Sequence, residues 1–204
     1  MDVNEWKLNY IYNLGMFSEK QRKHIPLRVD KDGTDTDAFK QLANIERNIV
    51  RFVNDGEQLY IHSQQAGNGK TSWALRLCQA YMNNIVETCS LNYKVLFISV
   101  PRFLLELKAN ISEKSEYIAD VTKGLLEADI VIWDDIATKG TTTQFEGEHL
   151  LSYIDNRISK GKTNIFTSNL NDEELHNALG DRLASRICNL SYNYEFKGMD
   201  KRGL

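Results

Sequence analysis

Residues 64–71 read Gln64-Gln65-Ala66-Gly67-Asn68-Gly69-Lys70-Thr71. This stretch lies between an apolar run that ends near Ser63 and a helical pattern that starts near Thr71. Small residues let the backbone curl so that successive amides point into one concavity, and the following helix adds its positive N-terminal end. The pattern predicts a phosphate-binding loop that is lined by Ala66, Gly67, Asn68, Gly69, Lys70 and Thr71.

Two side chains of this loop have a chemistry that nucleotide binding needs. Lys70 would reach the outer phosphates, and the Thr71 hydroxyl would bind a magnesium ion. One position departs from the G-x-x-x-x-G-K-[ST] pattern, because Gln64 stands where the first Gly is expected. That Gly eases the start of the loop, whereas the later Gly and Lys approach phosphate, so we interpret Gln64 as a variant. The alternative, a chance Gly-x-Gly-Lys-Thr in a surface loop, is disfavoured by the flanking strand and helix.

The bulk composition is that of one ordinary globular domain, or of one domain with a short appendage. The chain has 204 residues and a net charge of -3, which gives no global attraction to nucleic acid. Cys78, Cys89 and Cys188 are widely spaced, which argues against a disulfide framework and a zinc site. Neither a signal sequence nor an apolar run of membrane-span length is present, so we expect a cytoplasmic protein without membrane contact.

The sequence divides at about residue 38. Residues 1–37 are predicted to form a short helix and a polar linker or surface strap, and residues 38–204 the main domain. Trp6, Tyr10 and Leu14 are four apart and share one face of the first helix. That face either docks on a partner or, as we favour, packs against its own domain.

The rest of the chain alternates strand and helix patterns. Strands are expected at 58–62, 94–100, 129–135, 163–168 and, half-exposed, 190–196. Helices are expected at 38–53 with Asp37 as cap, 71–86, 101–111, about 118–125, 143–158, 171–179 and 181–188. This alternation predicts a three-layer α/β fold with a mostly parallel five-stranded sheet, in which ligands sit beyond the carboxyl ends of the strands.

Three polar residues follow strands at this expected edge. Asp134 and Asp135 end a continuously apolar strand, and Asn169 follows the next one along the chain. Asp134 can hold magnesium, Asp135 can orient or deprotonate an attacking water, and Asn169 can position that water. The alternatives are a turn with capping carboxylates and an Asn with an ordinary turn role.

Arg182 and Arg186 are four apart on one face of a short helix. Either can serve as an arginine finger, a cation that stabilises charge on the transferring phosphate, including one on a neighbouring subunit. An ordinary solvated helix face explains the spacing equally well.

With these residues identified, the chain resembles the AAA+ ATPases of the replicative helicase loader family, the DnaC/DnaI type, to which the IstB-type transposition helper ATPases are similar. The resemblance covers about Ala38 to the C-terminus. Its motifs are Gly67-Asn68-Gly69-Lys70-Thr71-Ser72 (Walker A), Ile132-Trp133-Asp134-Asp135-Ile136 (Walker B), Thr167-Ser168-Asn169 (sensor 1), Arg182-Leu183-Ala184-Ser185-Arg186 (the arginine-finger region) and Gly198-Met199-Asp200-Lys201-Arg202.

The resemblance implies an ATPase that uses ATP and Mg²⁺ and forms an ATP-dependent homo-oligomer. Arg186 would act on a neighbour's ATP, and Arg202 would be a sensor 2-like arginine. Hydrolysis would be slow, because Gln64 replaces a Gly and Asp135 stands where many AAA+ enzymes have Glu. A separate C-terminal lid domain is not expected.

The implied partners are a DnaB-type replicative helicase and single-stranded DNA. By the resemblance, residues 101–129 occupy the DNA-contacting region, with Phe103, Lys108 and Lys114 as candidate contacts. For Phe103 we favour the alternative of a core residue. The short N-terminal region is similar to that of loaders encoded by phages. Three other functions stay open: an IstB-like transposition helper, an ATP-binding module that regulates a partner with little turnover, and a small-molecule P-loop kinase.

Overall fold

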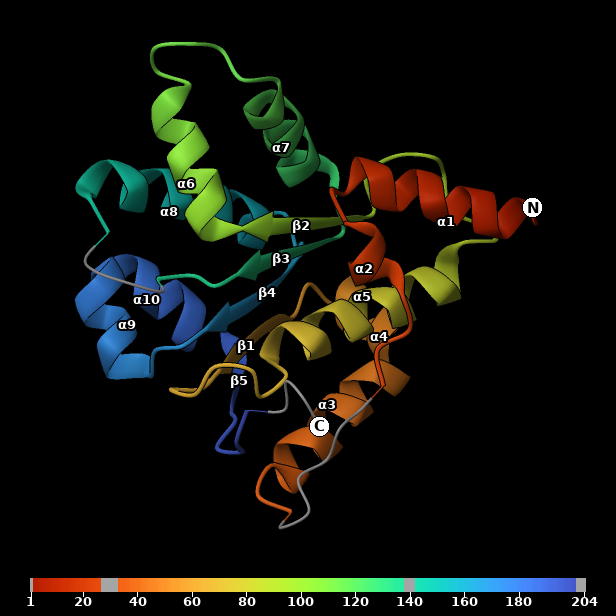
Figure 1. Cartoon of the computed structure of the whole chain (residues 1–204), viewed down its shortest axis with the longest axis horizontal. Coiled ribbons are helices and arrows are strands. Elements are labelled where there is room, and N and C mark those ends of the chain that lie inside the picture. Colours follow the sequence, from red (N-terminus) through yellow and green to blue (C-terminus); the bar gives the residue numbers. More distant parts are fainter. Residues whose placement is uncertain (1, 27–32, 138–141, 201–204) are drawn as a thin grey trace.

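The chain folds around one parallel sheet. The computed structural model describes residues 2–26, 33–137 and 142–200. Five strands pair in the order β2-β3-β4-β1-β5, all parallel (Figure 1). They are β1 (Gln58–His62), β2 (Val95–Ser99), β3 (Ile130–Asp134), β4 (Thr163–Ser168) and β5 (Ser191–Glu195). The predicted five-stranded α/β sheet is confirmed.

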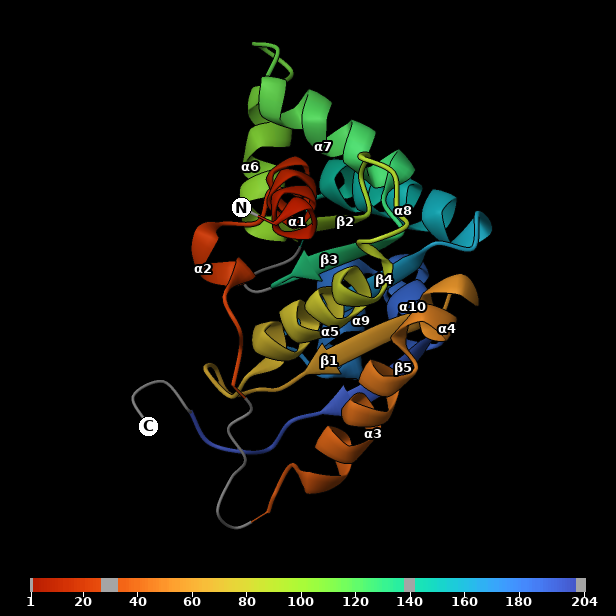
Figure 2. The same cartoon turned by 90° about the vertical axis from the view of Figure 1, so that its right-hand side faces the viewer.

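Helices cover both faces of the sheet (Figures 1 and 2). They are α1 (Val3–Leu14), α2 (Glu19–Arg22), α3 (Thr36–Arg47), α4 (Ile49–Asn54), α5 (Lys70–Ile85), α6 (Val100–Ala109), α7 (Glu116–Glu127), α8 (Gln144–Ser159), α9 (Asp172–Leu179) and α10 (Asp181–Cys188). Along β3, Ile130 and Ile132 join the core with α1, α3, α4 and α5, whereas Val131 and Trp133 join the core on the opposite face. Burial of both faces explains why this strand is apolar throughout.

The N-terminal segment packs against the same cores. Ile11 and Tyr12 of α1 are buried, and the amide of Phe97 in β2 donates to the Gly15 carbonyl at 2.9 Å. A side chain at Gly15 would clash with the Val95 carbonyl, so only glycine permits this close approach to the sheet edge. The residues after α1 therefore extend along the free side of β2.

The aromatic face of α1 is not where we expected it. The rings of Trp6 and Tyr10 stack with centroids 5.7 Å apart, but they are 46% and 40% exposed. The prediction that this face packs against its own domain is wrong for these two residues. The buried side of α1 is instead centred on Ile11 and Tyr12.

The region predicted as one helix at 38–53 consists of α3 and α4. Asn48 separates them, with φ -112° and ψ 24°, and its side-chain amide donates to the Asn44 carbonyl at 2.9 Å. An amide side chain that bonds to nearby backbone competes with the helical pattern. The helix also begins at Thr36, so Asp35 rather than Asp37 occupies the N-cap position.

The helices after β2 correct one expectation, for Ile111, and confirm the core position that we favoured for Phe103. Helix α6 ends at Ala109, so Ile111 lies beyond it and is exposed. Phe103 is fully buried and meets the Trp133 ring edge-on at 6.5 Å, so its ring is not available for stacking on a base. Lys108 pairs with Glu146 at 2.9 Å, and Lys114 is exposed.

A buried polar cluster holds the amino ends of the strands together, opposite the expected ligand edge. Arg157 of α8 is fully buried, and its guanidinium donates to the side chain of Asn164 at 2.8 Å. The same guanidinium donates to the backbone carbonyls of Leu125, Ala128, Asp129 and Thr163. Asn164 also accepts a bond from the Trp133 indole, so one arginine ties α7, α8, β3 and β4 together.

Among the described helices, none is long and apolar enough to cross a membrane.

Candidate nucleotide-binding site

The predicted phosphate loop connects the carboxyl end of β1 to the start of α5. Gly67 and Gly69 have φ of 76° and 106°, a left-handed conformation that glycine adopts at little cost. Gln64 does not have a positive φ, and its side chain reaches toward Glu174 at 3.4 Å. A glycine is therefore not required at position 64, which explains how the loop forms without the first Gly of the usual pattern.

A pocket of about 290 Å³ lies at this loop. It is lined by Ala66, Gly67, Asn68, Gly69, Lys70, Thr71, Ser72, Asp135 and Asn169. The structure thus brings together, at one edge of the sheet, the loop residues and the side chains predicted after β3 and β4.

Lys70 is buried at the base of this loop. Its ammonium group donates to the Gln65 carbonyl at 2.9 Å and approaches the side-chain oxygen of Asn68 at 3.4 Å. Asn68 is itself fully buried and donates to the Ser63 hydroxyl at 2.5 Å. The loop's own oxygens therefore keep the lysine at the position from which it can meet a phosphate oxygen.

Asp134 lies beside Thr71 at the end of β3. Its Oδ1 accepts hydrogen bonds from the hydroxyls of Thr71 at 2.7 Å and of Thr167 at 2.8 Å. Burial raises the pKa of the Asp134 carboxyl, while these two hydrogen bonds act in the opposite direction. Hydroxyl and carboxylate oxygens are hard ligands, so this pair fits magnesium.

Magnesium also needs ligands beyond these two residues. Within the described part of the chain, no group of three or more His, Cys, Asp or Glu side chains could hold a metal ion. An ion beside Thr71 and Asp134 would therefore take its other ligands from nucleotide and water, which is how proteins usually bind Mg²⁺.

Asp135 lines the pocket, whereas Asp134 faces Thr71. Asp135 has φ 57°, and its amide donates to the Thr167 hydroxyl at 3.0 Å. The next amide, of Ile136, donates to the Thr167 carbonyl at 2.9 Å, so the turn is fixed to β4. The surrounding structure must hold this left-handed residue in place, and the two neighbouring carboxylates differ in surroundings, with Asp134 bonded to Thr71 and Asp135 lining the pocket.

Asn169 directly follows β4 and lines the pocket opposite the loop. The preceding residue, Ser168, is fully buried and donates to the Ile136 carbonyl at 2.7 Å. This bond connects the end of β4 to the turn that carries Asp135, so both side chains that face the pocket share one rigid support.

The predicted arginines lie elsewhere. Arg182 and Arg186 of α10 both pair with Asp155 of α8, at 3.9 and 2.6 Å, and neither lines the pocket of its own chain. Arg202 lies outside the described residues.

Thr167 belongs to the sensor 1 motif, but the sequence analysis assigned no role to its own side chain. Its hydroxyl donates to Asp134 and accepts from the Asp135 amide, so it links both carboxylate positions to β4. The sequence does show a hydroxyl residue near the end of an apolar strand. Its contacts with Asp134 and Asp135 could be predicted only if β3 and β4 were known to be neighbours.

This fold and this site define the chain as an AAA+ P-loop ATP-binding domain. The sequence model of the family described as "IstB-like ATP binding protein" matches residues 29–189, and the chain belongs to that family. No curated protein matches the sequence.

Solved structures show the same fold at low sequence identity. The DnaC helicase loader is similar with a TM-score of 0.71 and 17% identity over 88% of this chain and 100% of the loader chain. DnaI has a TM-score of 0.67 and 18% identity over 88% and 94% of the two chains. The replication initiator DnaA bound to AMPPCP and single-stranded DNA has a TM-score of 0.62 and 17% identity over 89% of this chain and 51% of DnaA.

Proposed function

We propose that this chain is a slow, Mg²⁺-dependent ATPase that loads a DnaB-type replicative helicase onto DNA and self-assembles around ATP and single-stranded DNA. The observation that carries the ATPase assignment is the pocket in which Lys70, Asp135 and Asn169 meet beside the Thr71–Asp134 pair. The loader role is supported by the likeness to DnaC and DnaI and by the IstB-like family.

Each residue of the pocket has a defined task in this proposal. The loop amides and the N-terminus of α5 bind the phosphates, and Lys70 neutralises the outer ones. Thr71 and Asp134 hold Mg²⁺, which when bound offsets phosphate charge. Asp135 orients or deprotonates the attacking water, and Asn169 positions it.

Slow turnover is expected because of the side chain at position 135. Aspartate is one methylene shorter than the glutamate found in many AAA+ enzymes, and the turn that carries Asp135 is fixed to β4 through Thr167. On this turn, the shorter side chain would reach less far toward an attacking water than a glutamate would. General-base catalysis falls when the base is out of hydrogen-bond reach of the proton that it removes.

Assembly is proposed because Arg186 lies apart from the pocket of its own chain. Its guanidinium is partly exposed on α10, held by Asp155, where a neighbour's nucleotide can approach it. For DNA, the structure removes Phe103 as a stacking residue, so the contact in this proposal is electrostatic and depends on Lys108 and the exposed Lys114.

The first experiment measures ATP binding and turnover in the wild type, in Lys70→Ala and in the control Lys40→Ala. Lys40 is exposed on α3, and its one ion pair among the described residues is with Asp37 at 3.4 Å. We expect Lys70→Ala to lose turnover and Lys40→Ala to keep it. Unchanged turnover in Lys70→Ala would remove the loop from the mechanism.

A second experiment tests assembly and the trans role of Arg186. ATP- and DNA-dependent assembly is measured for the wild type and Arg186→Ala, and Lys70→Ala protein is then mixed with Arg186→Ala protein. A finger that acts in trans predicts that the mixture recovers turnover that neither variant has alone. A wild type that stays monomeric with ATP and DNA, or an Arg186→Ala variant that hydrolyses normally, would refute this part.

The second candidate function is an IstB-like transposition helper, which the family match favours. The pocket chemistry is the same in both cases, and the partner differs. Unwinding by a DnaB-type helicase is measured on a DNA template with a single-stranded region, with and without the chain. A loader should increase unwinding, whereas a transposition helper should not.

A further inference from the structure

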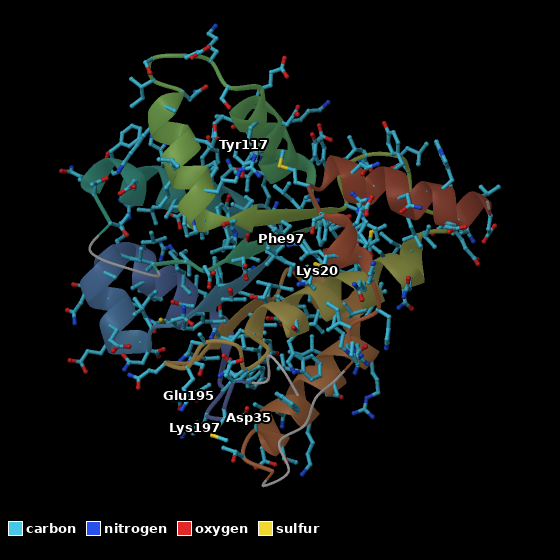
Figure 3. All side chains as sticks on the ribbon, in the orientation of Figure 1. Lys20, Asp35, Phe97, Tyr117, Glu195 and Lys197 are labelled. Carbon is cyan, nitrogen blue, oxygen red and sulfur yellow. The ribbon has the colours of Figure 1, made fainter. Side chains whose placement is uncertain are left out.

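One buried hydroxyl at the end of β1 holds the start of the phosphate loop. Ser63 directly follows β1 and is 1% exposed. Its Oγ accepts hydrogen bonds from the backbone amide of Gln65 at 3.1 Å and from the side-chain amide of Asn68 at 2.5 Å. In Figure 3 this end of the sheet is marked by Glu195, which pairs in register with His62, the residue before Ser63. The Ser63 hydroxyl is thus bonded to two residues of the loop.

The same two residues supply oxygens that hold Lys70. Its ammonium group donates to the Gln65 carbonyl at 2.9 Å and approaches Oδ1 of Asn68 at 3.4 Å. Because the nitrogen of the Asn68 carboxamide donates to Ser63, the oxygen of that group is directed toward the ammonium. Both oxygens therefore belong to residues that the Ser63 hydroxyl fixes in place.

Ser63 is also joined to the opposite wall of the pocket. Its backbone amide donates to the Ser168 carbonyl at 3.2 Å, which connects the end of β1 to the end of β4. Ser168 directly precedes Asn169, which lines the pocket across from the loop. Ser63 therefore lies where the loop that carries Lys70 meets the strand end that carries Asn169.

We propose that Ser63 is a positioning residue for binding the outer phosphates of ATP. Through Gln65 and Asn68, its hydroxyl fixes the oxygens that hold the Lys70 ammonium before a nucleotide arrives, and phosphate oxygens then take their place. A side chain that is ordered in advance loses less conformational entropy on binding. This hydroxyl adjoins position 64, where the loop lacks the first Gly of the usual pattern. The inference rests on the proposed ATP site.

The test compares Ser63→Ala, Ser63→Cys and the control Ser191→Ala in the full chain. Ser191 begins β5, and within the described residues its buried hydroxyl has no hydrogen-bond partner. Tm is measured for each variant, and the affinities for ATP and AMP are measured by competition with a fluorescent ATP analogue. Ser63→Ala should bind ATP about tenfold more weakly, which corresponds to the loss of about one hydrogen bond. Its affinity for AMP, which lacks the outer phosphates, should equal that of the wild type.

The other variants set the reference points. A thiol has a shape close to that of the hydroxyl but is a weak acceptor, so Ser63→Cys should fall between Ser63→Ala and the wild type. It also replaces Ser63→Ala in the comparison if the alanine variant does not fold. Ser191→Ala should match the wild type for both nucleotides.

Two results would overturn the inference. The first is a folded Ser63→Ala that binds ATP like the wild type. The second is an equal loss of affinity for ATP and AMP, because this would show that the hydroxyl only supports the fold of the loop. A wild type that binds neither nucleotide would instead refute the proposed function.

A double-mutant cycle tests the route from Ser63 to the lysine. Asn68→Ala is measured alone and together with Ser63→Ala. Since Ser63 is proposed to act in part through Asn68, the two losses of ATP affinity should be less than additive. Fully additive losses would contradict this route.

Discussion

Replacing Thr167 by valine removes the hydroxyl that links β4 to both carboxylate positions and keeps the shape of the side chain. The buried carboxylate of Asp134 loses its 2.8 Å donor, and the Asp135 amide loses its 3.0 Å acceptor. A hydrogen bond to a buried charged group contributes about 1.5–3 kcal/mol and a neutral one about 1 kcal/mol. The free energy of unfolding at pH 8 should therefore fall by about 2–4 kcal/mol in Thr167→Val.

The pH dependence of this loss has a defined sign. Burial already raises the pKa of Asp134 above its ordinary value of 3.8, and removing the Thr167 donor raises that pKa further. A raised folded-state pKa means that the folded protein binds more protons, so stability is lost as the pH rises through that pKa. The destabilisation by Thr167→Val should thus be full at pH 8 and should shrink as the pH falls toward 3.8.

The same strand supplies a matched control. Thr163 is also buried in β4, and within the described residues its hydroxyl has no hydrogen-bond partner. Thr163→Val should therefore leave the free energy of unfolding unchanged or slightly higher. Urea denaturation of both variants at pH 8 and pH 5 measures the difference. Equal unfolding free energies for the two variants at pH 8 would refute the role given to Thr167.

Three further predictions follow from named contacts. Arg157→Met should lower the free energy of unfolding by about 3–5 kcal/mol in urea denaturation, because it removes five hydrogen bonds at once, four of them buried. Asp155→Asn should strengthen ATP-dependent assembly in sedimentation by up to about fivefold, since it releases Arg186 from a partly exposed ion pair of at most about 1 kcal/mol. Gly15→Ala should lower Tm because of its clash with β2, whereas Gly147→Ala, with open space around it in α8, should raise stability by about 0.5–1 kcal/mol.

Local patterns in the sequence predicted the parts of this fold that depend on local physics. The phosphate loop and the five strands were recognisable because small residues, apolar runs and turn residues act over a few positions. The helix predicted at 143–158 starts with a capping box of Thr143 and Glu146, a device that also acts over a few positions. The helix start predicted near Asn171 is also present, with Glu174 completing the box.

The positions of several side chains could not be predicted from the sequence, because they depend on tertiary contacts. Asp35 and Asp37 are equally good capping residues by type, and only the structure shows that Asp35 takes the N-cap position while its carboxylate accepts bonds from the distant Lys197 and Gly198 amides. Arg157 looks like a surface residue on an amphipathic helix, yet it is buried because carbonyls of α7 and β4 surround it. Trp6 was expected to pack against its own domain but is exposed, because an aromatic face on a helix does not by itself identify the surface that covers it.

The charges in the pocket support an assembly rather than a single chain as the active unit. Lys70 is the only cationic side chain among the described residues that line the pocket, and Asp135 adds a negative charge there. A triphosphate brings several further negative charges, and charge that develops during phosphoryl transfer needs a cation close to the outer phosphate. Mg²⁺ at Thr71 and Asp134 supplies part of that charge. The proposed remainder comes from Arg186 of a neighbour, so nucleotide turnover and subunit contact would depend on the same electrostatic need.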